Sequence, residues 1–100
     1  MLKLNPFAAS DIYFFSALAN YNLHNVDIAE NHALEAAGLD LDHQNPRINY
    51  LLGVLMGQKK EYAAAAEHLR IYLQFSPTAT DTAAVKRLLK EAEEASGQPR

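Results

Sequence analysis

An internal repeat of about 36 residues constrains this chain more than any other feature. Shifted by that length, the sequence matches itself at Ile12 and Ile48, at Ala29 and Ala65, and at His32 and His68. Periods of this size are typical of stacked helical units that are each too small to bury their own apolar face. Stacking leaves an extended surface that commonly holds another protein, so the repeat favours binding over catalysis.

Length and composition fit a single small domain spanning residues 1–100. Hydrophobic residues make up 49% of the chain, and many of them are alanine. Alanine is the best helix former but buries little apolar surface per residue. We therefore expect closely packed helices around a modest core.

Charge and hydropathy exclude two classes of partner. The chain carries 9 basic and 12 acidic residues without a basic cluster, which disfavours nucleic acid. Its longest strongly apolar stretch, 12–19, is too short to insert across a membrane. The absence of cysteine rules out disulfides, and the sequence leaves the compartment open between cytoplasm and periplasm.

Apolar spacing predicts five helices and no strand. The predicted helices run from Ser10 or Asp11 to about Leu23, from Asn25 to Gly38, from Pro46 to Met56, from Tyr62 to about Phe75, and from near Thr78 and Asp81 to about Ala95.

Several residues are expected to mark the ends of these helices. Ser10, Asn25 and Asn45 are suited to N-cap positions, and Thr78 with Asp81 resembles a capping box. Gly38 is suited to a left-handed helix end.

The second repeat unit resembles the tetratricopeptide repeat family. The residues that carry the resemblance are Leu52, Gly53, Tyr62, Ala65, Leu69 and Pro77. The resemblance implies an all-α, right-handed superhelix of two helical hairpins, about 10–45 and 46–79, followed by a capping helix over 80–96. Leu4-Asn5-Pro6 is similar to the closing phrase of a preceding unit, and we expect the chain to be the carboxy-terminal piece of a longer repeat protein.

In that family the first helix of each unit lines the concave face. By matching position, the partner-binding residues implied here are Asp11, Phe14, Leu18, Tyr21, Asn22, Arg47, Tyr50, Val54 and Gln58. An alternative is that Phe14, Leu18 and Val54 pack against neighbouring helices. The paired basic residues that bind acidic chaperone tails in some members are absent from these positions, so we expect the partner to present an apolar or mixed peptide or helix.

Two functional hypotheses follow. The first is a non-enzymatic scaffold that binds a partner protein on its concave face. The second is an assembly element that pairs with itself, or with upstream repeats of a longer protein, through apolar residues around Phe7, Tyr13 and Phe15.

Neither a catalytic motif nor a cofactor-binding motif occurs in the sequence. His32 and His68 occupy equivalent positions but lack nearby ligands at metal-binding spacing, so we expect no metal there. Asp40, Asp42 and His43 lie together in a linker that offers no fixed coordination geometry.

Overall fold

Five helices make up the ordered framework. The computed structural model describes residues 6–40, 44–76 and 80–97. The helices are α1 (Pro6–Asn22), α2 (Val26–Leu39), α3 (Arg47–Gln58), α4 (Tyr62–Phe75) and α5 (Thr82–Ser96). The described residues contain no strand, which confirms the all-α prediction.

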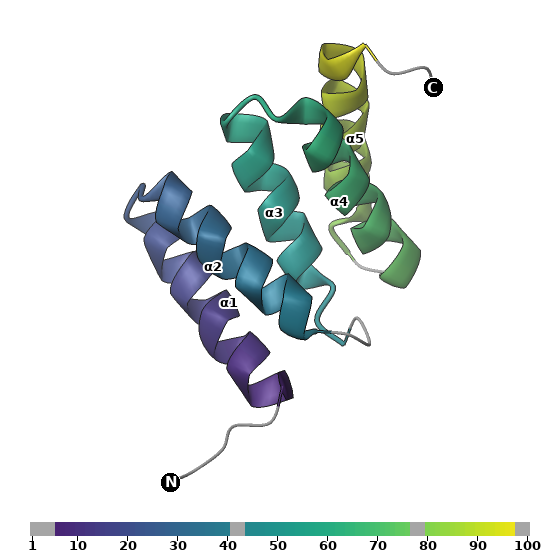
Figure 1. Ribbon diagram of the computed structural model, residues 1–100. Coiled ribbons are helices and arrows are strands. Elements are labelled where there is room, and N and C mark those ends of the chain that lie inside the picture. Colours follow the sequence, from purple (N-terminus) through teal and green to yellow (C-terminus); the bar gives the residue numbers. More distant parts are fainter. Residues whose placement is uncertain (1–5, 41–43, 77–79, 98–100) are drawn as a thin grey trace, which may run out of the picture.

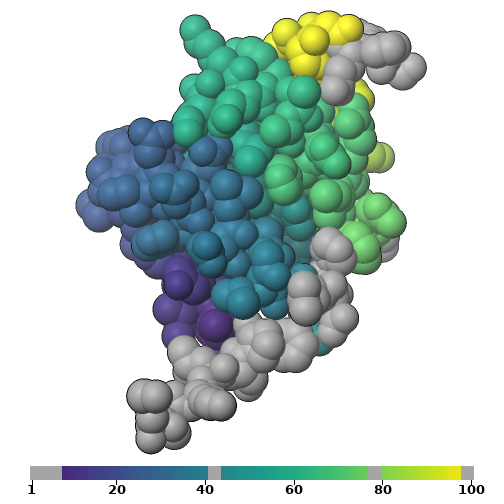
Figure 2. All heavy atoms as spheres, viewed as in Figure 1, coloured from purple at the N-terminus to yellow at the C-terminus, as the bar shows by residue number. Residues whose placement is uncertain are grey.

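Each helix packs against the next one along the chain (Figure 1). α1 and α2 form the first hairpin, α3 and α4 form the second, and α5 covers the far side of α4. The atoms of the two hairpins lie directly against one another in the space-filling view (Figure 2). The inner helices α2, α3 and α4 are therefore contacted on two sides, whereas α1 and α5 lie at the two ends.

The turns of the two hairpins have the same hydrogen bonds. His24 and Lys60 stand 36 residues apart, and both have a φ of 64°, in the left-handed region. After each of them, an amide closes the turn by donating to the preceding helix: Asn25 to the Asn20 carbonyl and Glu61 to the Met56 carbonyl, both at 2.8 Å. The internal repeat thus includes the backbone geometry of the turns.

The first helix begins earlier than predicted because Ser10 is not an N-cap. Ser10 is buried inside α1, and its hydroxyl donates a hydrogen bond of 2.8 Å to the Ala36 carbonyl on α2. The helix instead begins with Pro6, at a position where the missing proline N–H costs no helical hydrogen bond.

The predicted left-handed end at Gly38 is wrong. α2 continues through Gly38 to Leu39, and the Asp40 amide donates to the Ala36 and Ala37 carbonyls. Asp40 itself is buried, and its carboxylate accepts the amides of Gln44 and Asn45 at 2.9 Å each. These bonds hold the two described ends of the linker together, while Asp42 and His43 lie outside the described residues.

The predicted caps also differ from the structure. Asn25 occupies the N-cap of α2 as expected, but its side chain makes no capping hydrogen bond. Pro46 rather than Asn45 precedes α3, which ends at Gln58 instead of Met56 because the left-handed turn falls at Lys60. Asp81 precedes α5 without a side-chain capping bond, and both Thr78 and Pro77 lie outside the described residues.

The core depends on small residues that let the helices approach closely. Gly53 on α3 faces Leu69 on α4 so closely that an added Cβ would lie 2.5 Å from Leu69 Cδ2. Alanines do the same in the first hairpin, while larger apolar residues fill the space between hairpins. The fully buried members are Phe14, Ala17, Ala29, Ala33, Ala36, Ile48, Leu52, Leu55, Ala65, Ala66, Leu69 and Val85.

The two repeat-related histidines each bond to a polar side chain of the neighbouring helix. His32 Nδ1 lies 2.6 Å from Ser16 Oγ, and its ring meets Tyr13 edge-on. His68 Nδ1 lies 2.8 Å from Asn49 Oδ1, and burial lowers the pKa of this imidazole. Both histidines therefore tie the helices of their hairpins together.

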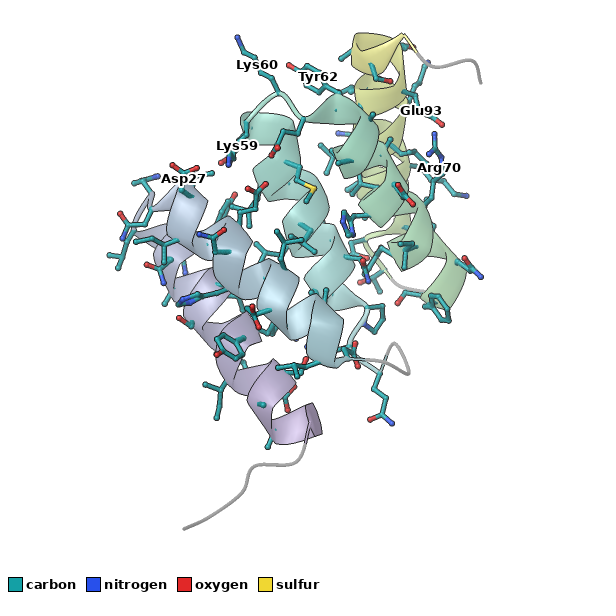
Figure 3. The ribbon with its side chains drawn as sticks, in the orientation of Figure 1. Asp27, Lys59, Lys60, Tyr62, Arg70 and Glu93 are labelled. Carbon is teal, nitrogen blue, oxygen red and sulfur yellow. The ribbon has the colours of Figure 1, made fainter. Side chains whose placement is uncertain are left out.

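Ion pairs join helices at the surface (Figure 3). Lys59 Nζ, at the end of α3, reaches back to α2 and lies 2.9 Å from Asp27 Oδ1 and 2.8 Å from Glu30 Oε1. Arg70 Nη2 on α4 lies 2.7 Å from Glu93 Oε2 on α5.

No helix in the described ranges has the length and apolar character needed to cross a membrane.

Candidate functional site: a groove between the first helices of the two hairpins

A groove of about 650 Å³ runs along α1 and α3 and is closed on one side by the start of α5. We call it the α1–α3 groove. The residues that line it are Phe14, Leu18, Tyr21, Asn22, Arg47, Tyr50, Leu51, Val54, Tyr72, Thr80 and Asp81. Its size is within the range of protein ligand sites, and its wall is mostly apolar and aromatic.

Seven of the nine residues implied by the family resemblance lie together in this groove: Phe14, Leu18, Tyr21, Asn22, Arg47, Tyr50 and Val54. The other two lie elsewhere. Asp11 borders a neighbouring hollow near Asp40 and Gln44. Gln58 lies beyond the opposite end of the groove, beside His24.

Phe14 forms part of the floor of the groove. Only 2% of its surface is exposed, so it belongs to the core, as the alternative interpretation held. The Arg47 guanidinium lies over its ring, with Cζ 5.2 Å from the ring centroid. This cation–π contact holds the Arg47 side chain at the groove. Leu18 and Val54 are half-buried and remain accessible from the groove.

A second aromatic pair forms the wall nearest α5. The rings of Tyr50 and Tyr72 lie 5.2 Å apart between centroids, and the Tyr72 hydroxyl donates a hydrogen bond of 2.6 Å to Asp81 Oδ1. Burial, together with the Asp81 carboxylate, raises the pKa of the Tyr72 phenol to about 12. Tyr72 is therefore a protonated hydrogen-bond donor at neutral pH, and it ties α4 to the residue before α5.

Sequence reasoning missed the part of the groove that α4 and α5 supply. The sequence predicts a capping role for Asp81 and indicates no functional role for Tyr72. Both face the groove because α5 packs back across α4. The spacing of each helix taken alone contains no signal of that crossing.

Within the described part of the chain, no three His, Asp or Glu side chains form a group that could hold a metal ion. The groove offers aromatic surface, one guanidinium, one carboxylate and amide groups, a set suited to recognition of a peptide segment. No family model, curated protein or solved structure matches the chain.

Proposed function

We propose that this chain is a non-enzymatic interaction module that binds an apolar segment of a partner protein in the α1–α3 groove. The observation that carries the proposal is the groove itself, where half-buried Tyr21, Tyr50 and Val54 line the same hollow as an arginine held over an aromatic ring. Tyrosine and arginine are the residues most enriched among the energetic anchors of protein interfaces.

The fold proposed to present this groove is a right-handed, tetratricopeptide-like superhelix. Two observations support it: the two hairpin turns share hydrogen bonds at an offset of 36 residues, and Gly53 stands where a close helix–helix approach requires a missing side chain. In such an arrangement the first helices of successive hairpins lie side by side, as expected of α1 and α3 on either side of the groove.

The groove residues indicate the kind of segment that would bind. Apolar side chains of the partner would contact Leu18, Tyr50 and Val54. Arg47 is in no ion pair among the residues the structure describes, so a carbonyl or carboxylate of the partner would accept its hydrogen bonds. The partner is therefore a mixed segment, mainly apolar with one acceptor group, in an extended or helical conformation.

A displayed library of random peptides selected on the purified chain tests this proposal. We expect selected peptides to combine apolar residues with an acidic group, and to bind Arg47→Ala and Tyr50→Ala at least tenfold more weakly than the parent chain. Affinities would be measured by isothermal titration.

The matched control is Arg87→Ala, which removes an exposed arginine from α5, away from the groove. We expect it to bind like the parent chain. Peptides whose affinity depends on neither Arg47 nor Tyr50, or depends on Arg87 to the same degree, would contradict the proposal. Phe14 is unsuited to this test because removing a buried phenylalanine costs about 3–5 kcal/mol of stability.

A further inference from the structure

Exposed apolar side chains gather on one face of the first helix. In the described residues, Ile12, Phe15 and Leu23 expose 54%, 63% and 69% of their surface. Together with exposed Ala19, they recur at spacings of three and four residues and form a line along α1 that ends at Leu23, the residue directly after the helix. We call this line the α1 stripe. The stripe lies opposite the side of α1 that carries buried Ser10, Phe14 and Ala17 into the core.

The internal repeat shows which residues of the second hairpin correspond to the stripe. Ile12, Phe15 and Ala19 have their equivalents 36 residues later in three residues of α3. Those equivalents are Ile48, Leu51 and Leu55, which are 1%, 7% and 0% exposed. α3 packs against α2 of the preceding hairpin, whereas α1 stands at the end of the stack (Figure 1). The α1 stripe is thus the counterpart of a helix–helix contact face, and no described residue covers it.

The residues of the stripe fit a second copy of the same helix. In an antiparallel pair with a two-fold axis near residue 17, Phe15 faces Ala19 of the other copy, and Ile12 faces Leu23. A large aromatic ring opposite alanine gives the complementary shape that close helix packing needs. The same register brings Asp11, the one charged residue of α1, toward His24 of the other copy. The two Asp11 side chains lie at opposite ends of this antiparallel pair, so they do not meet.

The opposite end of the stack is unsuited to continued head-to-tail association. α5 covers α4, and its outer face carries the exposed charges of Lys86, Arg87 and Lys90. An α1 stripe placed on that face would have to desolvate those charges without apolar contacts in return. A closed two-fold pair buries the stripe of both copies and leaves both charged ends in water.

We infer that the chain forms a two-fold symmetric homodimer through the α1 stripe. The groove residues Phe14, Leu18 and Tyr21 project from the other side of α1, so pairing leaves the groove open. The inference does not rest on the proposed function. The stripe offers about 370 Å² of apolar surface per copy, taking roughly 200 Å² for each of Ile12, Phe15 and Leu23 at their exposed fractions. Two copies would bury about 740 Å² in total, less than a standard stable interface, so we expect a weak, transient dimer with a dissociation constant on the order of tens of micromolar.

Sedimentation equilibrium from about 5 to 500 µM, a range that brackets this constant, would measure the association. We expect the parent chain to shift from monomer to dimer, and Phe15→Glu to weaken the dimer at least tenfold. The matched control is Phe75→Glu, which places the same charge at an exposed phenylalanine of α4, outside the stripe, and should leave the dimer unchanged. Should Phe15→Glu lower helicity, Ala19→Glu introduces the same charge on the same face in a helix-favouring residue.

Spin-label distances would test the antiparallel register. The chain contains no natural cysteine, so single labels can be placed at Asp11→Cys and Asn22→Cys. In an antiparallel pair, one copy labelled at residue 11 and the other at residue 22 should give a shorter distance than either labelled copy paired with itself. A chain that stays monomeric throughout, an equal effect of Phe75→Glu, or the reverse order of distances would each overturn the inference.

Discussion

Gly53 illustrates how one residue can decide the approach of two helices. Replacing it with alanine would improve helix propensity by about 1 kcal/mol. The added methyl group would however lie 2.5 Å from Leu69 Cδ2 and 2.6 Å from Leu69 Cγ, so the buried Leu69 side chain would have to shift. Because overpacking a core costs about 1–3 kcal/mol, we expect Gly53→Ala to destabilise the fold.

Gly38 provides the matched control for that substitution. It also lies inside a helix, but no atom stands within 4 Å of the Cβ it would gain. Gly38→Ala should therefore stabilise the chain by about 0.5–1 kcal/mol. Urea unfolding of both variants measures the two effects, and a gain in stability from Gly53→Ala would contradict the close approach of α3 and α4.

Tyr72 is the residue whose ionisation should be most visible in stability. Its pKa is raised in the folded chain to about 12 because the phenol is buried against the Asp81 carboxylate. A raised acid pKa stabilises the fold at pH values below the unfolded pKa of about 10, and this stabilisation is lost as the pH rises through about 12. We therefore expect the parent chain to lose its greater stability over Tyr72→Phe as the pH rises from about 10 to about 12.

The Tyr72→Phe variant isolates this effect from the other tyrosines and lysines, which titrate in both proteins. At neutral pH it should be less stable than the parent by about 1.5–3 kcal/mol, because it removes a hydrogen bond to a charged group. Chemical denaturation of both proteins at pH 7 and at pH 11 gives the difference in their free energies of unfolding at each pH. A difference between the two proteins that does not change with pH would contradict the placement of the phenol beside Asp81.

At the scale of elements, Lys59 links the end of α3 to the start of α2. Glu30 is only 8% exposed; Lys59 binds one of its carboxylate oxygens, while no described residue hydrogen-bonds to the other. Burial would raise the pKa of Glu30, but the hydrogen bond and charge of Lys59, together with neighbouring Glu61, lower it. Lys59→Met should therefore destabilise the chain more than Arg70→Met, whose ion pair with Glu93 involves a more exposed cation.

The pH dependence distinguishes a lost ion pair from a packing change. Because the pKa of Glu30 is lowered in the folded chain, its stabilisation is present above its ordinary pKa and lost as the pH falls through the folded value. The difference in melting temperature between the parent chain and Lys59→Met should therefore become smaller from pH 7 to pH 3. A difference of constant size would indicate that Lys59 contributes through its aliphatic stem instead.

The helices and their order could be predicted from the sequence because apolar spacing sets which residues face a core. Their ends could not, because tertiary contacts decided them. Ser10 has the chemistry of an N-cap, yet its hydroxyl bonds to Ala36 across the hairpin. Gly38 has the chemistry of a helix end, yet Asp40 closes that helix through its amide and holds the linker through its carboxylate.

The same distinction holds for the candidate site, where some residues could be predicted from the sequence and others could not. Residues of α1 and α3 could be assigned to one face because the repeat places them at equivalent positions. Tyr72 and Asp81 could not, because they meet only once α5 crosses α4. The burial of Phe14 was likewise undecided, since spacing alone does not say whether Arg47 will cover its ring.

At the scale of the whole molecule, the packing of each helix predicts its local stability: helices with neighbours on two sides should open less readily than the end helices. α2, α3 and α4 are contacted on two sides, whereas α1 and α5 are contacted mainly on one. Amide hydrogens in the inner helices should therefore exchange roughly tenfold more slowly than those in the end helices, because end helices can open without disturbing the rest. Exchange measured by NMR at low protein concentration checks this, and uniform protection would show that the five helices unfold as one unit.

The two end helices should then differ in how they respond to protein concentration. If copies pair through the α1 stripe, raising the concentration covers Phe15 and its neighbours, so opening of α1 requires dissociation first. The charged outer face of α5 gains no such cover. Protection should consequently rise along α1 but not along α5 between dilute and concentrated samples, and Phe15→Glu should abolish the rise. Equal increases at both ends would instead indicate non-specific association, because only a specific contact protects one end of a stack of this kind.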